Sequence, residues 1–278
     1  MAYKVILVHL DTARNTDVRI HWAIHLAKTQ QAHLIGVSAV GLSRYYFESA
    51  LSTESIYPVF LDLEEARNSA KEVARQFKEA CDRAGGTSCE SHIIEDDAFG
   101  SLEKQARYCD LLILGQYDAE KSFNPMDASL ARDMLLSSGG PVLIIPKANT
   151  SLKPNPGQRI LIAWNGSVEA RRVVRDAIPL LHLADTVNIV VFNPDGHGED
   201  PGARLIAYLH HHGIAAHCST EVATYHDVHE RLSAKLVATK SDLLVMGGYG
   251  HTPFYETMLG GVTRAVLLGM PVPVLMSH

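Results

Sequence analysis

The sequence lacks the features that membrane, secreted and nucleic-acid-binding proteins need. It has no uninterrupted apolar run of the roughly 18 residues that a membrane helix requires. The opening residues, MAYKVILVHLD, have neither the apolar length nor the cleavage site of a signal peptide. The formal net charge is −6, whereas a nucleic-acid-binding surface normally needs a basic patch. These absences favour a cytoplasmic protein that binds neither membranes nor nucleic acids.

Cysteine is scarce as well, and the 4 cysteines form no C-x-x-C pair. This spacing argues against a disulfide framework and against a zinc site, and it fits a reduced cytoplasmic protein. The run His210–His212 raises the question of a metal site, but consecutive residues of a helix point in different directions. We therefore expect an exposed helix end there, and no metal site.

The sequence contains an internal repeat. VILVHLDT (5–12) matches ILIAWNGS (160–167), with Asp11 opposite Asn165 at an offset of 154, and CDLLILGQYD (109–118) matches SDLLVMGGYG (241–250) at an offset of 132. We expect two domains, residues 1–147 and 158–278, joined by a linker at 148–157 that is rich in Pro, Asn and Gly. The two offsets differ by 22 residues, and this extra length falls most naturally in the aromatic-rich stretch 41–62.

Each repeat alternates apolar runs with amphipathic segments. In the second repeat, strands are expected at 159–164, 186–193, 215–223, 242–248 and 271–277, with helices at 167–184, 202–213, 227–240 and 260–269. Unbroken apolar strands between helices indicate a parallel sheet that is covered on both faces. The fold class is therefore α/β, with two tandem doubly wound domains that each contain a five-stranded, mainly parallel sheet. Such sheets bind ligands at the carboxyl ends of their strands.

Two helix starts carry capping residues. Ser167 is expected to cap the helix that begins after it, because a serine hydroxyl accepts a hydrogen bond from a free N–H of the first turn. The acidic residues at 95–97 could serve acid–base chemistry, but their place before a helix start favours capping.

A glycine cluster follows the apolar run SDLLVM. Gly247, Gly250 and Gly260 have the spacing G-x2-G-x9-G in GGYGHTPFYETMLGGVTR (247–264). Glycines in that place let backbone N–H groups approach an anion closely, with a helix start behind them. They also suit a tight turn between strand and helix. The spacing alone leaves both interpretations open.

This spacing, on the fourth strand of a five-stranded unit, resembles the ATP-binding motif of universal stress proteins. The opening strand and turn ILIAWNGS and the closing strand MPVPVLM resemble that family too. The resemblance implies a tandem universal stress protein with the adenine nucleotide α-hydrolase-like fold. It also implies binding of ATP or AMP, or of no nucleotide, and a role in stress-linked regulation rather than fast catalysis.

Transferred position by position, the resemblance implies a nucleotide site in the second repeat. Its residues are Ala163, Asn165, Phe192, Gly247, Gly250, Gly260, Gly261, Val262 and Thr263. Asn165 stands where the family often has Asp, and it keeps a hydrogen-bond acceptor. Gly261 stands where the family often has Ser or Thr, so one hydroxyl contact to phosphate is lost, and Thr263 offers another. Phe192 matches a backbone contact to adenine.

The first repeat departs further from that motif. Gly115 matches Gly247, but Asp118 and Ala128 stand in place of the next two glycines. A carboxylate at Asp118 would repel phosphate oxygens. Asp11 is retained and Ser129 supplies a hydroxyl, yet we expect no phosphate tail to bind in this repeat.

Three functions compete. The first is a nucleotide-binding regulator, with ATP or AMP in the second repeat and Mg²⁺ possible. The second is an interaction or scaffold protein without nucleotide. The third, an ATP-consuming enzyme, lacks the SGGxDS and HIGH signatures, and no general base is evident even for slow ATP hydrolysis, so no catalytic residue is predicted. The resemblance also implies antiparallel pairing of the closing strands 141–145 and 273–277, within the chain or in a homodimer.

Overall fold

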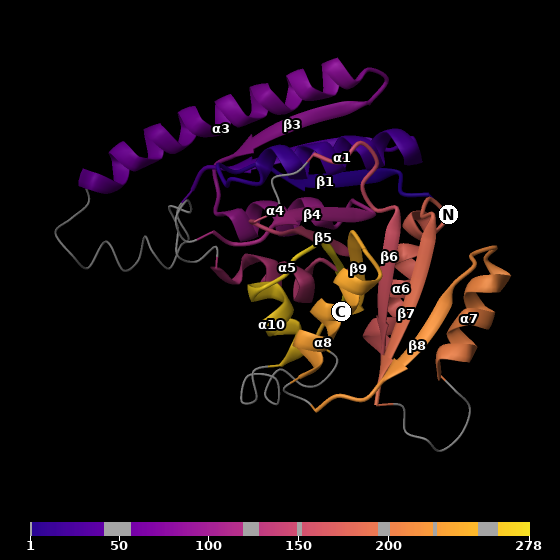
Figure 1. Cartoon of the computed structure of the whole chain (residues 1–278). Coiled ribbons are helices and arrows are strands. Elements are labelled where there is room, and N and C mark those ends of the chain that lie inside the picture. The colour runs from indigo at the N-terminus through magenta and orange to yellow at the C-terminus, as the bar shows by residue number, and fades with distance from the viewer. Residues whose placement is uncertain are drawn as a thin grey trace. The chain divides into compact units, whose positions relative to one another are not determined.

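The structure is a computed structural model that describes residues 2–41, 57–118, 128–148, 152–193, 201–224, 227–249 and 261–278, with the backbone alone at 57–62. The chain divides into two compact units (Figure 1). One contains Ala2–Gly140. The other contains Pro141–Asn149 together with Lys153–His278. The alternation of strands and helices confirms the α/β class expected from the apolar runs.

The first unit contains a parallel sheet in the order β3-β2-β1-β4. Its elements are β1 (Val5–His9), α1 (Thr16–Gln30), β2 (His33–Ala39), α3 (Tyr57–Ala84), β3 (Cys89–Ile94), α4 (Ala98–Ala106), β4 (Leu111–Gly115) and α5 (Leu130–Ser137). The central strands β1 and β4 are buried along most of their length, as strands covered on both faces should be. The long helix α3 packs along β2 and β3.

The second unit has the strand order β5-β10-β9-β6-β7-β8. Its elements are β5 (Val142–Ile145), β6 (Arg159–Trp164), α6 (Val168–Leu181), β7 (Thr186–Phe192), α7 (Pro201–His211), β8 (His217–Glu221), α8 (Val228–Ala238), β9 (Leu243–Gly247), α10 (Val262–Leu268) and β10 (Val274–Ser277). Every strand and helix expected in this repeat is present, with ends that differ by a few residues.

Strand β5 belongs to the first repeat in sequence but groups with the second unit in space. It pairs antiparallel with β10, with Leu143 opposite Leu275. This is the antiparallel pairing expected of the two closing strands, made within one chain. The repeat boundaries at 147 and 158 stay a prediction about the sequence, because contacts place the division of the chain before β5.

Side-chain caps fix two helix starts as the sequence predicts. The Ser167 hydroxyl accepts the N–H of Ala170 at 3.1 Å and begins α6. The carboxylate of Asp97 accepts the N–H of Gly100 at 2.6 Å and begins α4. Both helices follow a strand directly, so each cap sets where the chain turns back along the sheet.

Candidate functional site

Three strand ends bring predicted site residues of the second repeat together. Strand β6 lies between β9 and β7, and all three run parallel. Ala163 is the second-last residue of β6, and Asn165 directly follows that strand. Phe192 and Gly247 are the last residues of β7 and β9. Because carboxyl ends of parallel strands meet at one edge of a sheet, these four residues lie along the same edge.

Asn165 shapes the turn that leaves this edge. Its side-chain oxygen accepts the N–H of Ser167 at 3.1 Å, and Gly166 between them has a φ of +73°. This is an Asx turn, in which the asparagine side chain holds the backbone two residues on. Asn165 itself is exposed at the sheet edge.

Gly247 is a glycine because a helix backbone lies against it. A Cβ at this position would lie 2.6 Å from the backbone nitrogen of Ala170 and 2.8 Å from the carbonyl carbon of Glu169. The first turn of α6 therefore needs glycine there, whatever ligand is bound. This supports the turn between strand and helix as the reason for the first glycine of the cluster. Phosphate binding then depends on the later glycines.

The later part of the glycine loop is described only in part. Gly250 and Gly260 lie outside the described residues. Gly261 caps α10 without a side chain, and Val262 and Thr263 open that helix. The Thr263 hydroxyl, which is buried, accepts the N–H of Tyr249 at 3.3 Å. Thr263 thus joins the two sides of the loop.

Sequence reasoning missed one residue at this edge. His278 follows β10, and its Nδ1 lies 3.2 Å from the carbonyl oxygen of Gly248. Arg172 of α6 donates to the backbone oxygen of His278 at 2.6 Å. Since β10 runs parallel to β9, with Ser277 opposite Gly247, the register of the two strands was the signal that placed His278 beside the loop.

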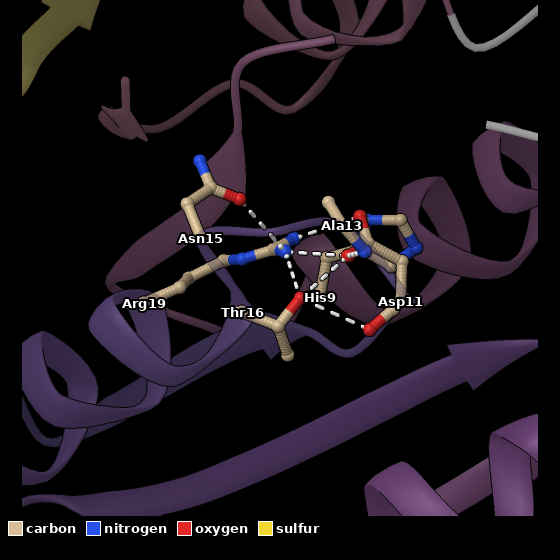
Figure 2. Close-up of polar contacts among 6 residues, drawn as sticks. All are labelled: His9, Asp11, Ala13, Asn15, Thr16 and Arg19. Carbon is tan, nitrogen blue, oxygen red and sulfur yellow. Dashed lines mark hydrogen bonds and ion pairs between the residues drawn. The ribbon is translucent and has the colours of Figure 1, made fainter. Parts of the chain in front are cut away.

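The matching edge of the first repeat holds a buried arginine instead. Arg19, on α1, is fully buried and donates from Nη1 to Asp11 Oδ2 at 3.0 Å and from Nη2 to Asp11 Oδ1 at 2.5 Å (Figure 2). Nη2 also donates to the Thr16 hydroxyl at 2.8 Å. Asp11 further accepts the N–H of Ala13 at 2.9 Å, which repeats the Asx turn of the second repeat. A fork of two N–H groups on one carboxylate is a strong and specific pairing.

The pKa values of two side chains record this network. Burial would raise the pKa of the Asp11 carboxyl, but the charge and hydrogen bonds of Arg19, with His9 and Ala13, outweigh it and hold the pKa well below its usual range. Burial lowers the pKa of His9 to about 4, against the opposing pull of Asp11. His9 Nδ1 lies 3.5 Å from Asp11 Oδ2. At neutral pH the cluster therefore holds a charged Asp–Arg pair beside a neutral imidazole.

Asp118 and its surroundings extend that cluster. Asp118 is buried and lies 3.7 Å from Nε of Arg14, in the loop between β1 and α1. A Cβ on Gly115 would lie 3.1 Å from the guanidinium carbon of Arg19. Ser129, noted in the sequence for its hydroxyl, donates that hydroxyl to Asp133 at 2.6 Å. The end of β4 in the first repeat is thus occupied by charged side chains of the protein itself.

The two repeats differ at matching positions. With the offset of 154, Asp11 corresponds to Asn165, and Arg19 corresponds to Val173, which is fully buried on α6. The comparison of repeats could have revealed Arg19, because an arginine stands where the second repeat has a core valine.

The first unit also has an open groove of about 500 Å³ between the β1–α1 loop and α3. Most of its lining residues are of polar type: Asp11, Thr12, Ala13, Arg14, Thr16, Asp17, Asn68, Ser69, Glu72, Val73 and Gln76. The exposed carboxylate of Glu72 is held by Arg75 and Gln76.

The described residues hold neither a cluster of metal ligands nor a helix that could cross a membrane. Over those residues, no three His, Cys, Asp or Glu side chains come together as metal ligands would. The ring of His212 packs edge-on against Tyr208, with centroids 4.7 Å apart. Among the helices of the described part, none has the length and apolarity to cross a bilayer.

Comparisons with known proteins fit the geometry of the fold. The model of the universal stress protein family matches residues 2–146. A universal stress protein from Archaeoglobus fulgidus DSM 4304 has 19% identity and a TM-score of 0.72, covering 98% of this chain and 94% of its own. A functionally unknown protein from Pseudomonas aeruginosa PAO1 has 19% identity and a TM-score of 0.61, covering 99% and 92%. A comparison with curated protein sequences found no match.

Proposed function

The chain belongs to the universal stress protein family, and from that premise we propose that its second repeat binds an adenine nucleotide and that the protein acts as a stress-linked regulator. The ligand is ATP or AMP, with Mg²⁺ accompanying the phosphates of ATP. The binding residues are those named from the sequence: Ala163, Asn165, Phe192, Gly247, Gly250, Gly260, Gly261, Val262 and Thr263. The protein works in the cytoplasm, alone or as a homodimer.

One observation carries this proposal. The carboxyl-end edge of the sheet is occupied by a charged side-chain pair in the first repeat, and the matching positions of the second repeat hold uncharged residues. In the first repeat, Arg19 and Asp11 pair at the ends of β1 and β4, and Asp118 adds a buried carboxylate. In the second repeat, Val173 and Asn165 stand at the positions of Arg19 and Asp11. At the position that matches Arg19, the second repeat has the buried Val173 in place of an arginine, which supports a ligand in the second repeat.

The described contacts suit a nucleoside at that edge. The side-chain oxygen of Asn165 accepts the hydrogen bond of the Asx turn, and its NH₂ group is a hydrogen-bond donor. Phe192 ends β7, where its backbone groups lie beside the ends of β6 and β8. Backbone N–H groups of the glycine loop would meet the phosphates, since such groups bind anions without a side chain.

The test is a calorimetric titration of ATP with Mg²⁺, and of AMP alone, into the full chain freed of bound nucleotide. Gly260→Asp puts a carboxylate where phosphate oxygens would lie, so binding should fall at least tenfold, about 1.4 kcal/mol. Ala128→Asp is the matched control, because 128 is the corresponding position of the first repeat. It should leave the affinity unchanged.

The outcomes separate the candidate functions. One site per chain that Gly260→Asp removes and Ala128→Asp keeps is the expected result. Two sites per chain would contradict the account of the first repeat. If wild type gives no heat and carries no adenylate after purification, the interaction protein without nucleotide becomes the better function, and the glycines are turn residues.

A further inference from the structure

Two of the cysteines lie against each other between α3 and β3. In the parallel register of β2 and β3, Leu34 is opposite Cys89, and both lie on the face that also carries Gly36. Helix α3 covers this face, because a Cβ on Gly36 would lie 3.0 Å from the ring of Phe77. Cys81 is one helical turn beyond Phe77 on α3. Because α3 runs back toward the start of β3, Cys81 comes to lie over Cys89, and the two thiols interact electrostatically.

The chain between the two cysteines turns back sharply. The two residues therefore come close together through a local turn, and no contact between distant parts of the chain is needed. Gly85 and Gly86 both have positive φ, +67° and +69°, and the N–H of Gly85 donates to the carbonyl of Cys81 at 3.1 Å. Left-handed backbone at two consecutive residues is readily adopted by glycine. This turn ends the helix and brings the first residue of β3 under its last turn.

The two thiols differ in access to solvent. Cys81 is 2% exposed. Burial, followed by the hydrogen bond and charge of Cys89, raises the pKa of the Cys81 thiol, so it keeps its proton at neutral pH. Cys89 is partly exposed and begins β3, the edge strand in the order β3-β2-β1-β4. A dissolved oxidant therefore reaches Cys89 first.

We propose that Cys81 and Cys89 are a peroxide-sensitive pair that forms a reversible disulfide inside the first unit. The Cys89 sulfur, as thiolate, attacks one oxygen of hydrogen peroxide, the O–O bond breaks, and a sulfenic acid and hydroxide result, the latter taking up the thiol proton as water. The Cys81 sulfur then attacks the sulfenic sulfur, giving up its proton, and a second water leaves. The two thiols lose two electrons in all, which reduce one peroxide to two waters.

The disulfide would join the end of α3 to an edge strand. It closes a loop over residues 81–89, which restricts the unfolded chain and the local opening of the last turn of α3. The oxidised protein should therefore have a melting temperature about 5 °C higher, a change that dithiothreitol reverses.

Peptide mapping of the full chain tests the proposal directly. Trypsin cuts after Arg83, which lies between the two cysteines, so the disulfide appears as peptide 79–83 linked to peptide 84–104. Thiols are counted by alkylation before and after one equivalent of hydrogen peroxide. The expected result is a fall from four free thiols to two, with the linked peptides present and lost again on reduction.

Variants separate this pair from general oxidation. Cys89→Ser changes a partly exposed residue and should fold normally while forming no linked peptide. Cys218→Ser is the matched control, because Cys218 is also partly exposed on a strand, β8. It should still form the bond. The proposal is overturned if wild type keeps both thiols after peroxide, if Cys89 goes on to sulfinic acid beside a free Cys81, or if Cys89 links two chains.

Discussion

Replacing Asp11 by alanine tests whether the buried arginine depends on its partner. The Arg19 side chain is 0% exposed and donates two hydrogen bonds to the Asp11 carboxylate. Without that carboxylate, the guanidinium keeps the Thr16 hydroxyl at 2.8 Å and a long contact of 3.5 Å to Asn15. Removing one partner of a buried ion pair costs roughly 3–5 kcal/mol, because a charge stays buried without compensation.

The reverse change should cost less. Arg19→Met removes the buried charge but keeps most of the packing of its stem. The Asp11 side chain that remains is 33% exposed, keeps the N–H of Ala13 and can be hydrated. We expect a loss of roughly 1–3 kcal/mol. The double variant should be more stable than Asp11→Ala alone, since it removes the orphaned charge.

Unfolding in guanidinium chloride measures these differences, provided that one unit is observed at a time. The chain has 2 tryptophans, and Trp22 lies buried on α1 of the first unit. In a Trp164→Phe background, the fluorescence of Trp22 reports the first unit alone. The reasoning is refuted if Asp11→Ala costs less than about 1 kcal/mol, or if Arg19→Met costs more than Asp11→Ala.

Three further changes have defined outcomes. Because burial lowers the pKa of His9 to about 4, wild type should lose stability as the pH falls from 6.5 to about 4, since the unfolded histidine takes up a proton there before the folded one does. His9→Gln should remove this contribution, which is worth up to about 1.4 kcal/mol per pH unit, and denaturant titrations at several pH values measure it. Gly247→Ala forces a Cβ to 2.6 Å from the nitrogen of Ala170 and should lower the free energy of unfolding by roughly 1–3 kcal/mol. Gly140→Ala, with open space around it, is the control and should stay within about 0.5 kcal/mol of wild type. Equal melting temperatures for the two variants would contradict this. Ser167→Ala should lose about 1 kcal/mol with the cap of α6, and unchanged thermal unfolding would show that the cap is unimportant.

Much of the fold could be predicted because its signals are local. Apolar runs such as 160–164 fix buried strands, and the repeat at offsets 154 and 132 fixes the order of elements. Ser167 could be assigned as a cap because its role depends on residues within one turn. The pairing of β5 with β10 joins strands more than 100 residues apart, so no local signal indicates it, and only the family resemblance predicted it.

The candidate site was predictable in position but not in its packing. Four residues of the second repeat meet at one edge because parallel strands end together. The reason for glycine at Gly247 was not visible, since it lies in the backbone of α6. The burial of Arg19 was also missed, because a charged residue on a helix is normally assigned to the surface, and only its aspartate partner makes a buried place tolerable.

The two sheet edges differ in a way that sets how many nucleotides one chain should bind. Both repeats make the same Asx turn, by Asp11 with Ala13 and by Asn165 with Ser167, so the backbone of the site is built the same way in each. What differs is the side chain that faces the edge from the first helix. If the Asp11 carboxylate left the Arg19 guanidinium to bind a nucleoside, a buried charge would stay unpaired, and this exchange is energetically unfavourable. The proposed nucleotide site should therefore occur once per chain.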